Sequence, residues 1–145
     1  MKNKKLVLFS ILVIAILALT ACKAPVAEVA VKSVTFAENL DANYQPVNPT
    51  TQFYTTDTIY VSVKLAGNPK SGSINGKFYY GDQLISEAGL DFGNLTQGTI
   101  YSSGAETFVG FNLSPSEPWP VDTDYRFELI LNGVKVGDYA YQVVQ

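Results

Sequence analysis

The chain has 145 residues, which accommodates one domain once an N-terminal targeting segment is set aside. Hydrophobic residues make up 47% of it and charged residues 16%, a balance that favours a packed core over disorder. It has no histidine and one cysteine, which excludes histidine-based acid–base catalysis, most metal sites and an internal disulfide; no cofactor is expected.

The first residues have the pattern of an export signal. Lys2, Lys4 and Lys5 give a positively charged start, and an apolar run without charges covers 6–19. This run is shorter than the roughly 20 residues of a membrane-spanning helix and fits the hydrophobic region of a signal peptide. Because lysines tend to hold their end of the chain in the cytoplasm, we expect the rest to be exported.

The sequence Leu19-Thr20-Ala21-Cys22 resembles the lipobox of bacterial lipoproteins. The resemblance implies that the Cys22 thiol receives a diacylglycerol, that a peptidase removes the signal peptide 1–21, and that acyl chains such as palmitate hold Cys22 in a bilayer. Each buried methylene contributes about 0.8 kcal/mol, so a few chains anchor a small domain. An uncleaved membrane anchor, with Cys22 incidental, is the alternative.

The residue after the cysteine bears on which membrane is used. In lipoproteins of bacteria with two membranes, an aspartate there often signals retention in the inner membrane, and this chain has Lys23. The resemblance therefore implies a protein of the cell envelope that faces away from the cytoplasm, on the outer membrane if the source has one.

Residues 22–28 are expected to form a tether and residues 29–145 a domain. Three of the ten basic residues lie in the signal peptide, so the processed chain would carry 7 basic and 13 acidic side chains, a net charge of −6. Nucleic acid is not an expected partner, because phosphate binding needs clustered Lys and Arg.

Glycine and proline interrupt the domain at short intervals, and the runs between them alternate with period two, as strands do. In 57–66, the odd-numbered residues from Ile59 to Leu65 are apolar, while Tyr60 and Lys64 point to the opposite face. The expected strands before residue 120 cover 29–37, 57–66, 73–80, 83–87, 96–102 and 106–113.

A hairpin is expected near the end of the chain. The run 125–131 alternates, and Asn132-Gly133 favours a two-residue turn because both residues tolerate positive φ. In the return strand the apolar positions change parity between Val136 and Tyr139, and a slip of one residue would expose half of that face. We therefore infer a β-bulge at Gly137-Asp138.

Seven or eight short strands predict an all-β fold, an antiparallel sandwich. The arrangement resembles the immunoglobulin-like domains of bacterial surface proteins. The sequence PVDTDYRF at 120–127 is similar to the corner of such domains, where a tyrosine, here Tyr125, opens a strand two residues before a core position, here Phe127. Jelly-roll and small-barrel folds are the alternatives.

Trp119 lies between Pro118 and Pro120. It either offers an exposed ring to a sugar or a protein partner, or it folds over the end of the sandwich and closes the core. The segment 39–56 is expected to be a long loop, and such loops are often functional, which makes Tyr54 a candidate binding residue. The alternative for this segment is a strand that crosses the sandwich edge, with Phe53 filling the core.

Asn48-Pro49-Thr50-Thr51 is similar to the Asn-Pro-Thr-Thr-Gly loop of chagasin-type cysteine-peptidase inhibitors, which are also immunoglobulin-like. That family carries Arg-Pro-Trp in its last loop, and Glu117-Pro118-Trp119 occupies a comparable place. The resemblance implies that Pro49 to Thr51 and Trp119 would enter a protease cleft. Gln52 in place of the glycine and Glu117 in place of the arginine depart from the pattern.

An enzyme is not expected. A glycosidase needs two carboxylates that face each other across a cleft, and a sandwich of this size has little chain to build one. The sequence therefore predicts a non-catalytic binding or scaffolding role, with the bilayer as one partner and an envelope protein or glycan as another. The candidate ligand-binding residues are Trp119, Tyr54, Asn48, Pro49, Thr50 and Thr51.

Overall fold

The computed structural model describes residues 29–94 and 100–145, and their regular structure is β-strand throughout. The expected signal peptide, Cys22, the tether and most of the strand expected at 96–102 lie outside the described residues. In the described part, no helix has the length and apolar character needed to cross a bilayer. The strands are β1 (Ala30–Leu40), β2 (Pro46–Pro49), β3 (Gln52–Tyr54), β4 (Ile59–Ala66), β5 (Ser73–Tyr80), β6 (Gln83–Asp91), β7 (Ile100–Ser103), β8 (Glu106–Leu113), β9 (Asp122–Leu131) and β10 (Val134–Val144).

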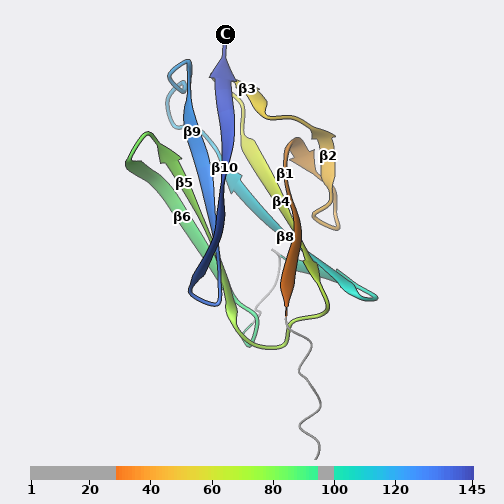
Figure 1. The fold of residues 1–145 in the computed structure, drawn as a ribbon. Helices are drawn as coiled ribbons and strands as arrows, with labels where there is room; N and C mark the ends of the chain where they lie inside the picture. Colours follow the sequence, from red (N-terminus) through yellow and green to blue (C-terminus); the bar gives the residue numbers. More distant parts are fainter. Residues whose placement is uncertain (1–28, 95–99) are drawn as a thin grey trace, which may run out of the picture.

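These strands form two sheets that pack face to face (Figure 1). One sheet has the order β2-β1-β4-β8-β7 and the other the order β3-β10-β9-β5-β6. The run β1-β4-β8-β7 is the A-B-E-D order of immunoglobulin domains, and β5-β9-β10 is their C-F-G order. The expected all-β sandwich is therefore confirmed, and the order of these strands is the one found in immunoglobulin domains.

The strands outnumber the expected seven or eight because the segment 39–56 contains two short strands, β2 and β3. The hairpin partner β2 pairs with β1, and β3 pairs with the end of β10. The second pairing is parallel, an exception in a sandwich expected to be antiparallel. Phe53 is buried in the core, so the expectation of a long loop is wrong and the alternative, an edge strand with Phe53 inside, holds.

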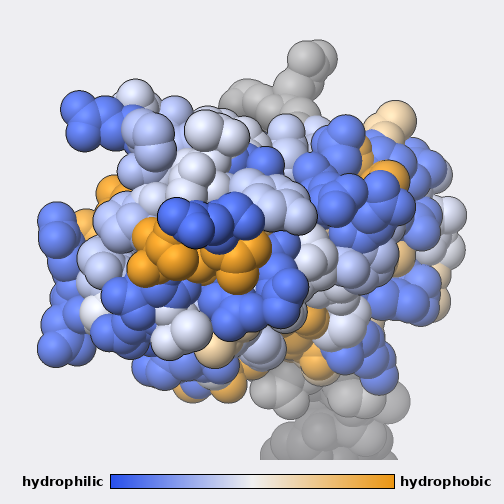
Figure 2. Space-filling view, turned by 90° about the horizontal axis from the view of Figure 1, so that it is seen from above, coloured by the Kyte–Doolittle hydropathy of each residue, from blue (hydrophilic) through white to orange (hydrophobic). Residues whose placement is uncertain are grey.

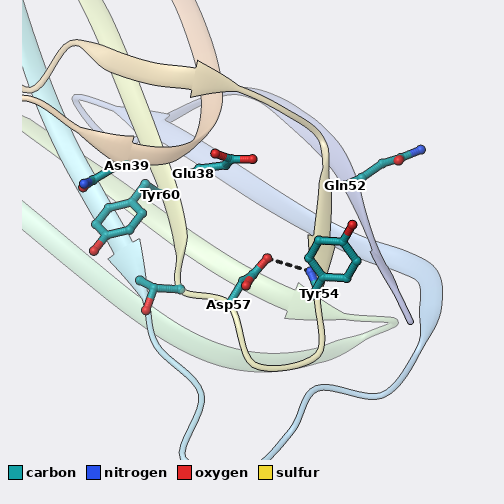
Figure 3. Close-up of a pocket in the computed structure, with 7 residues that line it drawn as sticks. Glu38, Asn39, Gln52, Tyr54, Asp57 and Tyr60 are labelled. Atoms are coloured by element: carbon teal, nitrogen blue, oxygen red, sulfur yellow. Dashed lines mark hydrogen bonds between the residues drawn. The ribbon is translucent and has the colours of Figure 1, made fainter.

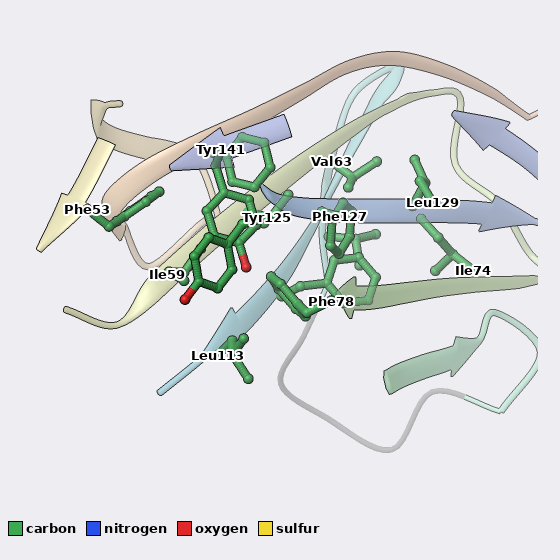
Figure 4. Close-up of a cluster of buried hydrophobic side chains, with 14 of the residues drawn as sticks. Phe53, Ile59, Val63, Ile74, Phe78, Leu113, Tyr125, Phe127, Leu129 and Tyr141 are labelled. Carbon is green, nitrogen blue, oxygen red and sulfur yellow. The ribbon is translucent and has the colours of Figure 1, made fainter. Parts of the chain in front are cut away.

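The core lies between the sheets, where alternation directs the apolar side chains (Figure 4). The odd-numbered residues of β4 from Ile59 to Leu65 are fully buried, as predicted. Across from them, Phe127 of β9 contacts Phe78 and Phe111, with ring centroids 4.9 Å and 5.4 Å away. Burial of each such side chain contributes about 1.5–3 kcal/mol, which makes this aromatic layer a main source of stability.

The hairpin of β9 and β10 confirms the predicted turn, since Asn132 and Gly133 have φ of 52° and 77°. The register shift lies between Lys135 and Gly137, so the bulge falls on Val136, one residue before the expected position. It brings the later tyrosine and valine side chains of β10 to face the core.

The predicted tyrosine corner is present. The Tyr125 hydroxyl donates a 2.7 Å hydrogen bond to the carbonyl oxygen of Pro120, and both Tyr125 and Phe127 are buried. This bond ties the segment before β9 to the core.

The two ends of the sandwich carry different parts of the chain. In Figure 1, β1 begins at the lower end, where Ala30 pairs with Ala66, and the C-terminus lies at the upper end. Ile59, at the start of β4, pairs with Leu113, at the end of β8, so the segments 55–58 and 114–121 meet at the upper end. At about 3.3 Å per residue, β4 separates the two ends by roughly 25 Å.

Candidate functional site

A hollow of about 460 Å³ opens at the upper end, between β1, β3 and the start of β4 (Figure 3). Its volume is in the range of about 300–1,000 Å³ that small-molecule sites occupy. We call it the tyrosine hollow. Its lining consists of Glu38, Asn39, Gln52, Tyr54, Asp57, Thr58 and Tyr60.

A tight turn between β3 and β4 positions one wall of the tyrosine hollow. The backbone N–H of Tyr54 donates to Oδ2 of Asp57 at 2.8 Å, and the backbone N–H of Asp57 donates to the Tyr54 carbonyl at 3.1 Å. An aspartate side chain that bonds nearby backbone stabilises such turns. The result is a fixed carboxylate beside the Tyr54 ring, which is 60% exposed.

The hairpin of β1 and β2 positions the opposite wall. Nδ2 of Asn48 donates to Oε2 of Glu38 at 3.0 Å. Asn48 has a φ of 51°, in the left-handed region that asparagine tolerates better than most residues. Asn48, a predicted binding residue, thus holds Glu38 and does not itself line the hollow.

Figure 3 shows the carboxylates of Glu38 and Asp57 between the rings of Tyr54 and Tyr60. Every lining side chain carries a hydrogen-bonding group, and none of them is basic or aliphatic. The hollow is therefore polar and negatively charged, with aromatic rings at two places on its wall.

The other residues of the predicted Asn-Pro-Thr-Thr site lie elsewhere. Pro49, Thr50 and Thr51 line a separate hollow of about 350 Å³ next to β1. The Thr50 N–H donates to the Phe36 carbonyl at 3.0 Å, and the Thr51 carbonyl accepts from the Gln142 N–H at 2.9 Å. This segment therefore links the two sheets through its backbone.

Trp119 is half-buried and packs against the core. Its backbone N–H donates to the Thr55 carbonyl at 2.7 Å, and its indole Nε1–H donates to the Asp57 carbonyl at 3.0 Å. Of its two interpretations, closure of the sandwich end therefore describes the geometry. Trp119 also holds the turn that carries Asp57, and so supports the tyrosine hollow from behind. It lines a different hollow of about 250 Å³ together with Leu84.

The sequence singled out Tyr54 but missed Glu38, Asn39, Gln52 and Asp57 as members of one site. These residues come from β1, from β3 and from the turn before β4, and their proximity depends on β3 joining the sheet of β10 while β1 stays in the other sheet. The only feature of the sequence that pointed to the rest of this site was Tyr60, which was predicted to face outward on the clearest strand.

The remaining surface offers weaker candidates. The upper end is mostly hydrophilic, with a compact hydrophobic patch near the centre of the view in Figure 2. The large hydrophobic side chains that are exposed are spread over β2, β3, β6, β10 and the segment before β9, which does not favour one large apolar docking surface. In residues 29–94 and 100–145, no three acidic or cysteine side chains gather as metal ligands would.

Comparison of the sequence with protein families and with curated proteins finds no match.

Proposed function

We propose that this protein is a lipid-anchored, non-catalytic binding protein of the cell envelope, which presents the tyrosine hollow away from its membrane. The observation that carries the proposal is the relation between the anchor sequence and the sandwich. The lipobox-like sequence ending at Cys22 precedes β1, and β1 begins at the end of the sandwich opposite the hollow.

Distances along the chain support this arrangement. Seven residues lie between Cys22 and Ala30, and the eight Cα-to-Cα steps, at about 3.5 Å each, span at most roughly 28 Å. The hollow lies about 25 Å further along the direction of β4. An acyl anchor at Cys22 therefore holds the lower end near the lipid and leaves the hollow accessible from the other side.

The lining of the hollow favours binding over catalysis. Glu38 is exposed and Asp57 is partly exposed. A general acid for glycosidic cleavage needs surroundings that keep its carboxyl protonated, which burial usually provides. The chain has no histidine to activate the Thr58 hydroxyl, and no lysine lines the hollow. The lining therefore offers aromatic rings and hydrogen-bonding groups, which are typical of binding sites.

The anchor is tested by expressing the full chain in a bacterium that is fed an alkyne-labelled fatty acid. We expect the unchanged chain to take up label, to lose residues 1–21 and to partition into the detergent phase. Cys22→Ala should remain unlabelled and unprocessed, and globomycin should block processing of the unchanged chain. Lys23→Ala, one residue away, is the matched control and should still be labelled. Label on Cys22→Ala, or an unlabelled native chain, would overturn the proposal.

A further inference from the structure

We infer that the tyrosine hollow binds a neutral sugar residue of a glycan. The inference rests on the proposed function, because it names the ligand of the same outward-facing site. It is carried by three properties of the lining: two aromatic rings, two carboxylates that are held in place by hydrogen bonds, and the absence of basic side chains among the lining residues.

The rings provide the apolar part of the contact. Tyr54 lies 60% exposed at one side of the hollow, and Tyr60 lies at the other side (Figure 3). A sugar ring presents C–H groups on its faces and hydroxyl groups at its edge. The face of a tyrosine ring, which combines apolar area with a polar tip, matches the first of these surfaces.

The groups between the rings match the hydroxyl edge. Carboxylates accept hydrogen bonds and amides both donate and accept them; the Thr58 hydroxyl already forms a hydrogen bond with the Ser114 hydroxyl at 3.0 Å. The two carboxylates are already oriented, Asp57 by the Tyr54 N–H at 2.8 Å and Glu38 by Asn48 at 3.0 Å. Groups ordered before binding lose less entropy when a ligand arrives, so this arrangement favours a small polyhydroxylated ligand.

The negative charge of the hollow favours neutral sugars over anionic ones. Glu38 and Asp57 repel phosphorylated, sulfated and carboxylated sugars, and no lining side chain offsets them. Lys64, four residues after Tyr60 and on the same side of β4, pairs with Glu106 at 2.8 Å. A neutral sugar is not repelled by these carboxylates and needs no counter-charge. A small organic cation is the competing ligand, and the experiment separates the two.

The experiment uses the full chain, extracted from membranes in a detergent without a sugar headgroup. A neutral glycan array identifies the best-bound glycan, and titration then measures its affinity for each variant. We expect Tyr54→Ala to weaken binding at least about tenfold and Tyr54→Phe, which keeps the ring, to change it less than about threefold. Tyr101→Ala removes a partly exposed tyrosine of β7 outside the hollow and should leave affinity unchanged.

Glu38→Gln and added salt test the charge argument. The substitution keeps hydrogen-bonding capacity, so a neutral sugar should lose less than about fivefold, and affinity should be the same at about 0.5 M salt. Spermidine and choline are the cationic probes. The inference is overturned if no neutral glycan binds, if Tyr54→Ala binds as the native chain does, or if the cationic probes bind in place of glycans. Because array binding does not depend on the acyl chains, these outcomes are independent of the Cys22 labelling result.

Discussion

Tyr125 and Tyr141 stack in the core with ring centroids 5.3 Å apart, and their hydroxyl groups have opposite surroundings. The Tyr125 hydroxyl donates to the Pro120 carbonyl at 2.7 Å. The Tyr141 hydroxyl is buried, and no described residue forms a hydrogen bond with it. The two tyrosines are neighbours in the core, but within the described part of the chain only the Tyr125 hydroxyl forms a hydrogen bond that stabilises the fold.

We therefore expect opposite results from removal of the same atom at the two positions. Tyr125→Phe should lower the free energy of unfolding by about 1 kcal/mol, because a hydrogen bond is lost and the Pro120 carbonyl loses its partner. Tyr141→Phe should leave the free energy of unfolding unchanged or raise it slightly, because a buried hydroxyl without a protein partner disappears. Urea unfolding of both variants measures the difference, and equal losses would contradict the assignment.

The same pair predicts sensitivity to alkali. Burial raises the pKa of Tyr125 to about 12, and burial also raises the pKa of Tyr141. A pKa that is higher in the folded than in the unfolded chain contributes stability that is complete below the unfolded value of about 10 and is lost as pH rises further. The urea concentration at the midpoint of unfolding should therefore decrease as pH rises from 10 to about 12. Tyr125→Phe should reduce this fall, and an identical pH dependence in the variant would refute the explanation.

The sequence was sufficient where a short pattern determines the structure. Alternation placed Ile59 to Leu65 in the core, Asn132-Gly133 specified its turn, and Tyr125 marked its corner, because each of these depends on neighbours within a few residues. The bulge was displaced by one residue to Val136, since parity shows that a register changes but does not give the residue at which it does.

Strands β2 and β3 were not predictable in the same way. Both are short, and Pro46 and Pro49 at the two ends of β2 favoured a loop. They are strands because β1 and β10 leave hydrogen-bonding edges for them, which is a tertiary effect. The tyrosine hollow depends on this effect as well, because Tyr54 and Glu38 line the same hollow only when β3 pairs with the edge of β10.

At the upper end of the sandwich, a hydrogen bond to Asp122 makes stability depend on pH in the acidic range. The Tyr80 hydroxyl donates to Oδ2 of Asp122 at 2.9 Å. This hydrogen bond has the largest effect in holding the pKa of Asp122 below its usual 3.8, and the hydrogen bond from the Thr123 N–H has the next largest. A lowered pKa in the folded chain contributes stability that is present above pH 3.8 and is lost as pH falls through the lower value.

Removal of the Tyr80 hydroxyl should therefore raise the pKa of Asp122 toward 3.8. The carboxyl carbon of Asp122, followed by NMR over an acid titration of Tyr80→Phe, measures this shift. Tyr79→Phe is the matched control, because the Tyr79 ring stacks on Arg126, with the guanidinium carbon 3.8 Å from the ring centroid, on the outer side of the same strand. A pKa for Asp122 that is the same in both variants would exclude the Tyr80 bond as the cause.

The hairpin of β1 and β2, which forms one wall of the tyrosine hollow, packs closely against Gly110 of β8. A Cβ on Gly110 would lie 2.6 Å from Cδ1 of Tyr44 and 2.9 Å from Cδ1 of Leu40, both at the hairpin of β1 and β2. The Ser62 hydroxyl donates to the Tyr44 carbonyl at 2.7 Å and fixes the same turn over the sheet. The close approach of the hairpin to β4 and β8 therefore requires a residue without a side chain at position 110.

Gly110→Ala should displace this turn and lower the free energy of unfolding by about 1–3 kcal/mol, as overpacking does elsewhere. Hydrogen exchange should speed up at the amides of Tyr44 and Gln45, which bond to the Asp41 carbonyl and side chain. Gly137→Ala is the control, because its added Cβ would meet no atom closer than 3.4 Å, and it should change stability by less than about 0.5 kcal/mol. If Gly110→Ala leaves exchange in the turn unchanged, the position of the hairpin does not depend on its close contact with β8 at Gly110.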